Sequence, residues 1–189
     1  MIKKNTQKII IFLLLVIFII SLIALLYFLS PEEIVNKIGI HNAYLFALVI
    51  SFLAGFSAWT SFSMVAVLIA LTLGGINPLY LGLISGAGLA TGDLIMFYAS
   101  SKGRELIKGK WEKRLDKFSK FFEGNFKKII PIISYIYIGL TPFPNDFLII
   151  FLALIKYPIK KLYLPIILGD LTYPLLITLL ATKGIMLFT

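Results

Sequence analysis

The stretch Thr141-Pro142-Phe143-Pro144-Asn145-Asp146 interrupts an apolar segment that runs from Ile129 to Ile155. Pro142 and Pro144 have no N–H group, so a helix through this segment has to break and leave backbone carbonyls without partners. In the hydrocarbon of a bilayer, such irregular backbone persists only where protein or a watery cavity covers it. A broken apolar segment that carries an acid is therefore typical of a site where a transporter holds a polar substrate or an ion.

The composition predicts an integral membrane protein with a single domain. Hydrophobic residues make up 59% of the 189 residues, and the mean hydropathy is +0.96. The chain has no cysteine, which excludes disulfides and thiol catalysis, and its one histidine, His41, argues against a histidine metal centre. The sequence also offers no serine–lysine arrangement of the kind that an intramembrane enzyme would need. We therefore expect no metal, no cofactor and no enzymatic activity.

The basic residues predict how the chain is oriented in a cell membrane. Of 18 lysines and arginines, 16 lie in the three short regions 3–8, 102–128 and 156–161, each beside an apolar segment. Such clusters are typical of cytoplasmic loops and of contact with anionic lipid headgroups. This pattern disfavours nucleic acid as a partner, despite the net charge of +9. It predicts a multi-pass protein with a cytoplasmic N-terminus.

Two of the apolar segments are predicted to be re-entrant hairpins. The segment 43–73 is interrupted at Ser57–Ser63, and the segment 129–155 is interrupted at Thr141–Asp146. If both crossed the membrane completely, the basic region 102–128 would lie outside. As hairpins, with arms of roughly 10–15 residues that are too short to span ~30 Å, they leave all 16 clustered basic residues inside. The full crossings are then predicted at 9–29, 79–101 and 162–183.

The chain shows an internal repeat after a predicted N-terminal transmembrane anchor at residues 1–30. Each half has a broken hairpin, a turn with proline, and a span that contains Gly-Asp-Leu, at 92–94 and at 169–171. The predicted membrane domain, 43–183, thus divides into repeat one (43–101), a cytoplasmic amphipathic connector (102–128) and repeat two (129–183). Because the hairpins enter from opposite sides, the repeats are inverted, which places a substrate site at their interface.

The connector contains a predicted amphipathic helix. Trp111, Leu115, Phe118 and Phe122 recur at helical spacing, and basic residues that include Lys113, Arg114 and Lys117 cover much of the remaining surface. Such a helix lies either on an anionic membrane surface or against the helical bundle as a connector. The spacing leaves both alternatives open.

The candidate site residues are the acids within apolar segments and the break itself. Asp93, Asp146 and Asp170 are these acids, and each costs ~2.5–3.5 kcal/mol at a bilayer centre unless it is neutral, paired or hydrated. They bind a proton or cation in one hypothesis and cap helix ends in the other, with Asp146 the best placed as an N-cap. The predicted substrate- or ion-binding set also includes residues of the break: Thr141, Pro142, Pro144 and Asn145.

The glycines of the two Gly-Asp segments are predicted to allow close helix packing. Gly82 and Gly86, and Gly88 and Gly92, each stand four residues apart, which is a small-residue spacing that lets helices approach closely. Gly169 holds the corresponding place in the second half. Local unwinding for a substrate is the alternative.

The stretch Ile84-Ser85-Gly86-Ala87-Gly88-Leu89-Ala90-Thr91-Gly92-Asp93, with Tyr98 and Gly103 after it, resembles the DedA superfamily. This superfamily is also called the VTT-domain or SNARE-associated Golgi protein family. Leu140–Asp146 resembles the proline-bearing second hairpin of its shorter members. The resemblance covers roughly residues 43–183. It implies inverted re-entrant hairpins and a flippase or scramblase that moves phospholipid or polyprenyl-phosphate between leaflets, with coupling to protons or sodium as an option.

The sequence departs from the family pattern at both hairpins. Ser57–Ser63 lacks the glutamate and proline that many relatives carry in the first hairpin. Arginines flank the second-hairpin proline in many relatives, and Gly139 and Asn145 stand in those positions here. An arginine pair is suited to a lipid phosphate, so only Lys156 or the interfacial lysines are left for that role. The alternative function is a non-transporting protein that organises the membrane or assists assembly, and homo-oligomerisation stays open.

Overall fold

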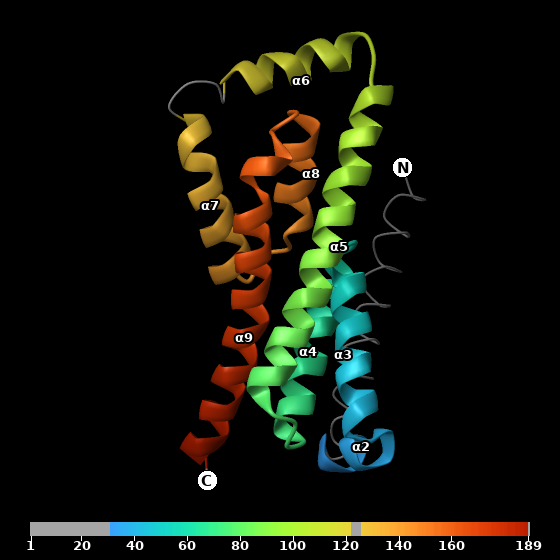
Figure 1. Cartoon of the computed structure of the whole chain (residues 1–189), viewed down its shortest axis with the longest axis vertical. Coiled ribbons are helices and arrows are strands. Elements are labelled where there is room, and N and C mark those ends of the chain that lie inside the picture. The colour runs from blue at the N-terminus through green and yellow to red at the C-terminus, as the bar shows by residue number, and fades with distance from the viewer. Residues whose placement is uncertain (1–30, 122–125, 189) are drawn as a thin grey trace, which may run out of the picture.

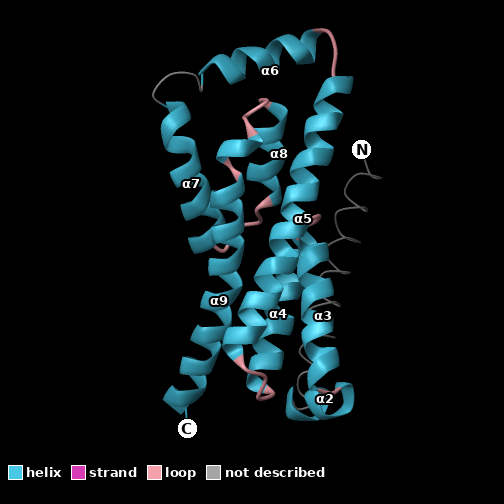
Figure 2. Ribbon diagram, viewed as in Figure 1, coloured by secondary structure: helices cyan, strands magenta, loops and turns pink. Residues whose placement is uncertain are grey.

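The computed structural model describes residues 31–121 and 126–188, and every regular element within these ranges is a helix (Figure 2). The prediction of an all-α chain is confirmed for this part. The predicted anchor, Ile9–Leu29, and Phe122 of the aromatic stripe lie outside the described residues.

Two long helices, α5 (Pro78–Leu106) and α9 (Tyr163–Phe188), form the centre of the molecule (Figure 1). Both are long and apolar enough to cross a membrane, α9 over the part Tyr163–Gly184. α5 begins at Asn77, whose side chain accepts hydrogen bonds from the N–H groups of Leu79 and Tyr80, with Pro78 in the first helical position. This start corresponds to the predicted turn.

Two helical hairpins pack on these long helices. Hairpin one consists of α3 (Ile40–Ala54) and α4 (Ala58–Leu73), and hairpin two consists of α7 (Phe126–Leu140) and α8 (Asp146–Leu154). α2 (Pro31–Ile38) precedes hairpin one. In Figure 1 the hairpins occupy opposite ends of the molecule, and both tips lie near its middle.

The break in hairpin one is earlier than the sequence suggested. It spans residues 55–57 rather than Ser57–Ser63, because Ser61 and Ser63 are helical in α4 and Ser57 precedes that helix. Ser61 bonds through its Oγ to the carbonyls of Ala54 and Ser57, at 3.0 and 3.2 Å. These bonds add to the backbone hydrogen bonds that the same two carbonyls accept at the tip.

Both hairpins end in the same backbone turn. Gly75 (φ +86°) and Lys156 (φ +59°) adopt the left-handed conformation. In each case the next residue, Ile76 or Tyr157, donates its N–H to a carbonyl five residues earlier and is buried. This is a Schellman motif, which satisfies the last carbonyls of a helix. The backbone at Lys156 thus adopts a conformation that usually favours glycine.

A short amphipathic helix lies across one end of the bundle. α6 (Lys110–Phe121) follows α5 and lies above hairpin two in Figure 1. The 3₁₀ helix η1 (Ile159–Lys161) joins hairpin two to α9. α5 extends beyond the predicted end at Ser101 to Leu106, and an ion pair at 3.3 Å between Lys102 and Glu105 supports its last turn.

The core consists of two apolar clusters, one around each hairpin. Met64, Leu68 and Leu81 belong to the first, whereas Ile138 and Ile149 belong to the second. The first half of α5 contributes to one cluster and its second half to the other. Asp93 lies in α5 between these two contributions.

Candidate functional site

Two buried aspartates meet between the apolar clusters. Asp93 of α5 and Asp170 of α9 each have 0% exposure. Asn145, at the tip of hairpin two, donates from Nδ2 to Asp93 Oδ2 at 3.3 Å and to Asp170 Oδ1 at 3.0 Å. One amide group, the bridging amide, thus holds an acid from each long helix. We call Asp93 and Asp170 the acid pair.

The acid pair retains oxygens without partners. Asp93 Oδ1 and Asp170 Oδ2 are buried, and neither has a hydrogen-bond partner among residues 31–121 and 126–188. The ion pairs of this part of the chain join Lys102 to Glu105, and Arg104 and Lys156 to Asp116, so none includes the acid pair. Burying a charged carboxylate without such compensation costs several kcal/mol. The arrangement therefore favours a bound proton or cation.

The electrostatics of the acid pair point to the same chemistry. Its two accepting oxygens lie within 3.3 Å of the same nitrogen, and two negative charges at such separation repel strongly where water is excluded. A proton or a monovalent cation between the carboxyl groups removes the repulsion. The described residues contain no group of three or more histidine, cysteine and acidic side chains suited to a metal ion.

A proline in α9 leaves the backbone carbonyl of Asp170 without its helical donor. Pro174 lies inside α9, four residues after Asp170, and has no N–H to donate to the Asp170 carbonyl. A Cβ built on Gly86 would lie 2.8 Å from that carbonyl oxygen, so the oxygen faces the α5–α9 interface. The Pro174 position offered a signal in the sequence that the motif analysis missed.

Asp146 is not the N-cap of α8, so the capping hypothesis for this residue is wrong in its position. The structure places Asn145, not Asp146, at the N-cap of α8, and the Asn145 side chain makes no capping hydrogen bond because it faces the acid pair. Asp146 is the first helical residue and is 8% exposed. Its carboxylate lies in the first turn, where the helix dipole favours negative charge.

The other residues of the break build the tip that carries Asn145. Thr141 donates from Oγ1 to the Tyr137 carbonyl at 2.6 Å, and the Tyr137 hydroxyl donates to the Pro144 carbonyl at 3.3 Å. The ring of Tyr137 also stacks on Phe143, with centroids 6.4 Å apart. These contacts give hydrogen-bond partners to one carbonyl at the end of α7 and to one carbonyl in the tip.

A small cavity lies where the tip of hairpin two faces hairpin one. Its volume is about 20 Å³, enough for about one water molecule. Ser61, Phe62 and Met64 of hairpin one line it together with residues 142–145 of hairpin two, and Leu89 and Tyr173 complete it. The predicted site residues Pro142, Pro144 and Asn145 therefore adjoin one space.

A glycine contact accompanies each member of the acid pair. A Cβ on Gly55, at the tip of hairpin one, would lie 2.6 Å from the backbone nitrogen of Asp93, and Gly92 packs against the Phe52 carbonyl. In the other half, a Cβ on Gly169 would lie 2.6 Å from Cγ2 of Ile138 and 3.2 Å from the nitrogen of Gly139. Each aspartate thus follows a glycine that lets a hairpin approach closely.

The remaining predicted packing glycines face neighbouring helices. A Cβ on Gly82 or Gly86 would come within 2.8 Å of the backbone of α9, and one on Gly88 would lie 2.6 Å from the Leu48 carbonyl of α3. At each of these glycines the backbone of a neighbouring helix therefore approaches α5 closely. All three lie within the continuous helix α5.

The predicted surface helix α6 has three different sides. Trp111 and Phe118 are exposed, at 64% and 59%, and a second side carries the exposed basic residues Lys113, Arg114 and Lys117. The third side, at Asp116 and Ser119, contacts the bundle. Because a polar side makes this contact, the aromatic side of α6 stays uncovered by the described residues.

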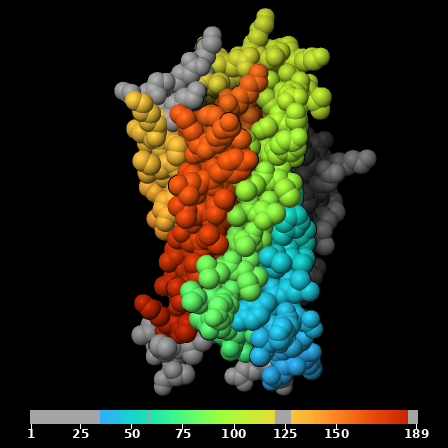
Figure 3. Space-filling model, in the orientation of Figure 1, coloured from blue at the N-terminus to red at the C-terminus, as the bar shows by residue number. Residues whose placement is uncertain are grey.

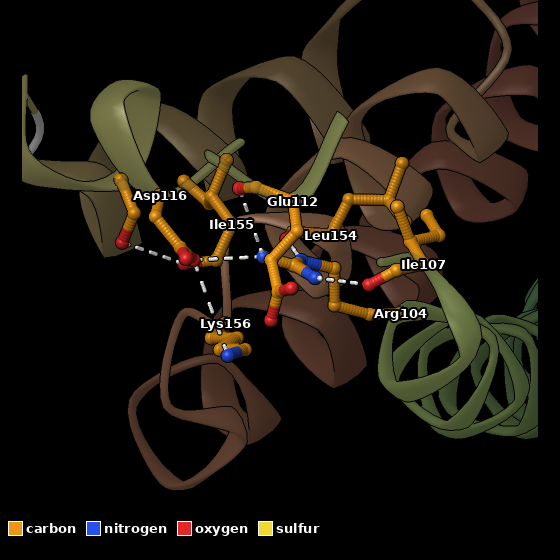
Figure 4. Close-up of polar contacts among 8 residues, drawn as sticks. Arg104, Ile107, Glu112, Asp116, Leu154, Ile155 and Lys156 are labelled. Atoms are coloured by element: carbon orange, nitrogen blue, oxygen red, sulfur yellow. Dashed lines mark hydrogen bonds and ion pairs between the residues drawn. The ribbon is translucent and has the colours of Figure 1, made fainter. Parts of the chain in front are cut away.

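Arg104 connects α6 to hairpin two (Figure 4). Its side chain is 2% exposed and pairs with Asp116 at 2.7 Å, and its Nε donates to the Leu154 carbonyl at 2.9 Å. Lys156 lies 4.0 Å from the same Asp116, and Ser119 donates to the Ile155 carbonyl at 2.8 Å. In the sequence Arg104 is one of the basic residues of the connector, and no local pattern there indicates that its side chain is buried.

Comparison with protein-family models, with curated proteins and with solved structures finds no match to this chain.

Proposed function

We propose that this chain is a multi-pass membrane protein in which α5 and α9 cross the bilayer and the two hairpins enter from opposite sides. The apolar length of α5 and α9 and the position of one hairpin at each end of the molecule (Figure 1) support this topology. The hairpin helices, with 9 to 16 residues, are too short to cross ~30 Å of hydrocarbon. The end with α6 then faces the cytoplasm, together with the N-terminus.

The two halves behave as inverted repeats in this proposal. Each half has a hairpin with a glycine at or next to its tip, a Schellman turn at its end, and a long helix with a Gly-Asp pair. The Gly-Asp pairs, Gly92-Asp93 and Gly169-Asp170, lie against the two hairpins. An inverted repeat places a binding site at the interface of its halves, and the acid pair lies at that interface.

The function that the geometry supports best is coupled lipid transport. The chain acts as a flippase or scramblase that moves phospholipid or polyprenyl-phosphate between leaflets, and a proton or sodium ion binds at the acid pair. The observation that carries this proposal is the bridging amide, through which Asn145 of a hairpin tip holds one acid from each long helix. Intramembrane acids that pair across helices mark ion pathways in transporters.

Ion binding controls the tip of hairpin two in this mechanism. With a proton or cation bound, the acid pair holds Asn145 and the tip stays against α5 and α9. When the ion leaves, the two carboxylates repel each other, and the tip moves and opens the space at the small cavity beside Pro142 and Pro144. The ion shifts the equilibrium only by its different affinity for the two positions of the tip.

Reconstitution tests the proposal. Purified protein in proteoliposomes should exchange a fluorescent phospholipid between leaflets, and a proton or sodium gradient should change the rate. Asp93→Asn and Asp170→Asn preserve side-chain volume and remove the charge. Each should abolish the response to the gradient and lower exchange roughly tenfold or more, as expected for an intramembrane coupling acid.

The matched control is Glu105→Gln, which removes an acid that is exposed at the far end of α5. This variant should exchange lipid at the wild-type rate. Size-exclusion profiles and helical content should be the same for all variants. Unchanged exchange and unchanged gradient response in both aspartate variants would contradict coupling at the acid pair.

A second candidate function rests on α6. Its exposed aromatic side and adjacent basic side are suited to an anionic membrane surface, so the chain acts instead as a non-transporting organiser of the membrane. In that case the reconstituted protein exchanges no lipid between leaflets. Trp111→Ser and Phe118→Ser then lower the binding of its proteoliposomes to separately added anionic vesicles.

A further inference from the structure

A groove between α7 and α9 is separate from the acid pair. Its volume is about 480 Å³, and Ile132 and Tyr135 of α7, Leu164 and Leu168 of α9, and Lys160 and Lys161 of η1 are among its lining residues. This volume lies within the range of small-molecule sites. Figure 3 shows α7 and α9 side by side on one face of the molecule.

The shape of the groove follows from how α7 and α9 cross. The two helices touch at Gly139 and Gly169, where a Cβ on Gly139 would lie 3.2 Å from the Gly169 Cα. The Tyr135 hydroxyl lies 3.4 Å from Thr172 Oγ1 and joins the helices next to that crossing. Toward Lys160 the helices are no longer in glycine contact, so the groove opens toward the basic end.

The lining separates into an apolar wall and a charged mouth. Ile132, Leu164 and Leu168 are 61%, 66% and 44% exposed, and they offer the wall to an apolar chain. Lys160 and Lys161 are exposed, and neither forms an ion pair with a described acid. No acidic side chain lines the groove.

We infer that this groove binds an anionic phospholipid, with its phosphate at Lys160 and Lys161 and an acyl chain between α7 and α9. The occupant must match two adjacent positive charges next to an apolar wall. An anionic lipid does so, because it has a negatively charged headgroup and apolar acyl chains. Lys156 is not among the residues that line the groove. If the chain transports lipid, this groove assigns anionic phospholipid as the substrate class, and in that respect the inference rests on the proposed function.

Binding of lipid to the full-length protein tests the inference without measuring transport. The probe is phosphatidylglycerol, titrated into the detergent-solubilised protein and detected by native mass spectrometry, with phosphatidylcholine as the zwitterionic comparison. Phosphatidylglycerol should bind more tightly, and the variant Lys160→Gln/Lys161→Gln should lose roughly tenfold or more of that affinity. The control, Lys37→Gln/Lys183→Gln, removes the same charge at two exposed lysines that do not line the groove and should keep the wild-type affinity.

A second variant tests the apolar wall at constant charge. Leu168→Trp fills the groove and should weaken phosphatidylglycerol binding, while its size-exclusion profile stays that of the wild type. Glycerol 3-phosphate, which has the phosphate without acyl chains, should not displace the lipid. Displacement at comparable concentration would mean a site for free phosphate and would overturn the inference.

Other outcomes also decide the question. Equal loss of affinity in the two double-lysine variants would assign the effect to general surface charge and overturn the site. Wild-type affinity in both Lys160→Gln/Lys161→Gln and Leu168→Trp would overturn it as well, whether the groove is empty or covered by a second copy of the chain. If lipid binding needs Lys160 and Lys161 but no lipid is exchanged in proteoliposomes, the groove stands and the proposed transport function fails.

Discussion

Hairpin one turns at residues 55–57, whereas hairpin two turns at residues 141–145, and the tip of hairpin two faces α4 of hairpin one across one small cavity. In each hairpin, a glycine packs on a Gly-Asp pair of a long helix, so the packing is nearly symmetric. Of the two hairpins, hairpin two is the one whose side chain, Asn145, bonds to the acid pair. Hairpin one therefore contributes packing against α5, whereas hairpin two contributes the polar side chain that bonds to the acid pair.

The packing side of the comparison is tested most strongly at Gly92. Gly92→Ala places a methyl group against the Phe52 carbonyl, and overpacking of this kind against backbone costs about 3 kcal/mol. Gly139→Ala meets its nearest atom at 3.2 Å and should cost only a few tenths of a kcal/mol. Thermal unfolding in detergent, followed by circular dichroism, measures both.

Equal losses of stability at Gly92 and Gly139 would show that the two hairpins are packed equally tightly. The geometry predicts a smaller loss at Gly139, because the added methyl group meets backbone at 3.2 Å there and lies closer than that to the Phe52 carbonyl at Gly92.

The polar side of the comparison is tested at Asn145. Asn145→Ala removes the only described donor to the acid pair and should cost about 2 kcal/mol, because it leaves buried acceptors unsatisfied. Ser61→Ala, near the tip of hairpin one, removes bonds to two carbonyls and should cost about 1 kcal/mol or less. Chemical unfolding of the two variants in the same detergent gives the difference.

A cost at Ser61 as large as that at Asn145 would contradict the assignment of the polar role to hairpin two alone.

The connection to α6 is a further asymmetry between the hairpins. Arg104→Gln removes the ion pair with Asp116 and should weaken the attachment of α8, at a cost of about 1.5 kcal/mol for lost charge-assisted bonds. Hydrogen exchange should then increase in α6 and α8 and stay unchanged in α4. Faster exchange in α4 as well would mean that α6 supports both hairpins.

A small effect is expected at the prolines of the tip. Pro144→Ala keeps the Pro144 carbonyl that accepts from Tyr137 and mainly increases the freedom of the unfolded chain, at about 0.5–1 kcal/mol. Thermal unfolding measures this difference as well. A loss above about 2 kcal/mol would show that the tip itself depends on the ring, beyond its effect on the unfolded state.

The sequence predicted the elements better than their contacts. Pro142 and Pro144 lack N–H groups, so the end of α7 at Leu140 followed from covalent chemistry. Hairpin one has no proline at its tip, and only weak serine signals suggested its break, which was therefore placed too late. The end of α5 was placed too early, because Lys102 and Arg104 look like a loop until Glu105 and Asp116 are seen as their partners.

The candidate site could be predicted as a set of residues but not as an arrangement. Asp93, Asp170 and Asn145 were candidates because each is polar within an apolar segment. Their meeting depends on the tertiary packing of α5, α8 and α9, which a local pattern does not contain. For the same reason Lys160 and Lys161 were indistinguishable in the sequence from the other interfacial lysines, and the groove beside them was not foreseen.

The length of α5 has a consequence for the membrane in which the chain works. With 29 residues, α5 is about 43 Å long at ~1.5 Å per residue, roughly 13 Å more than a typical hydrocarbon core. An upright α5 therefore holds α6 away from the acyl chains, and tilting brings it down. Since helix tilt follows bilayer thickness, a thinner membrane lowers Trp111 and Phe118 toward the lipid. In the proposed topology, bilayer thickness therefore sets how close the aromatic side of α6 comes to the lipid.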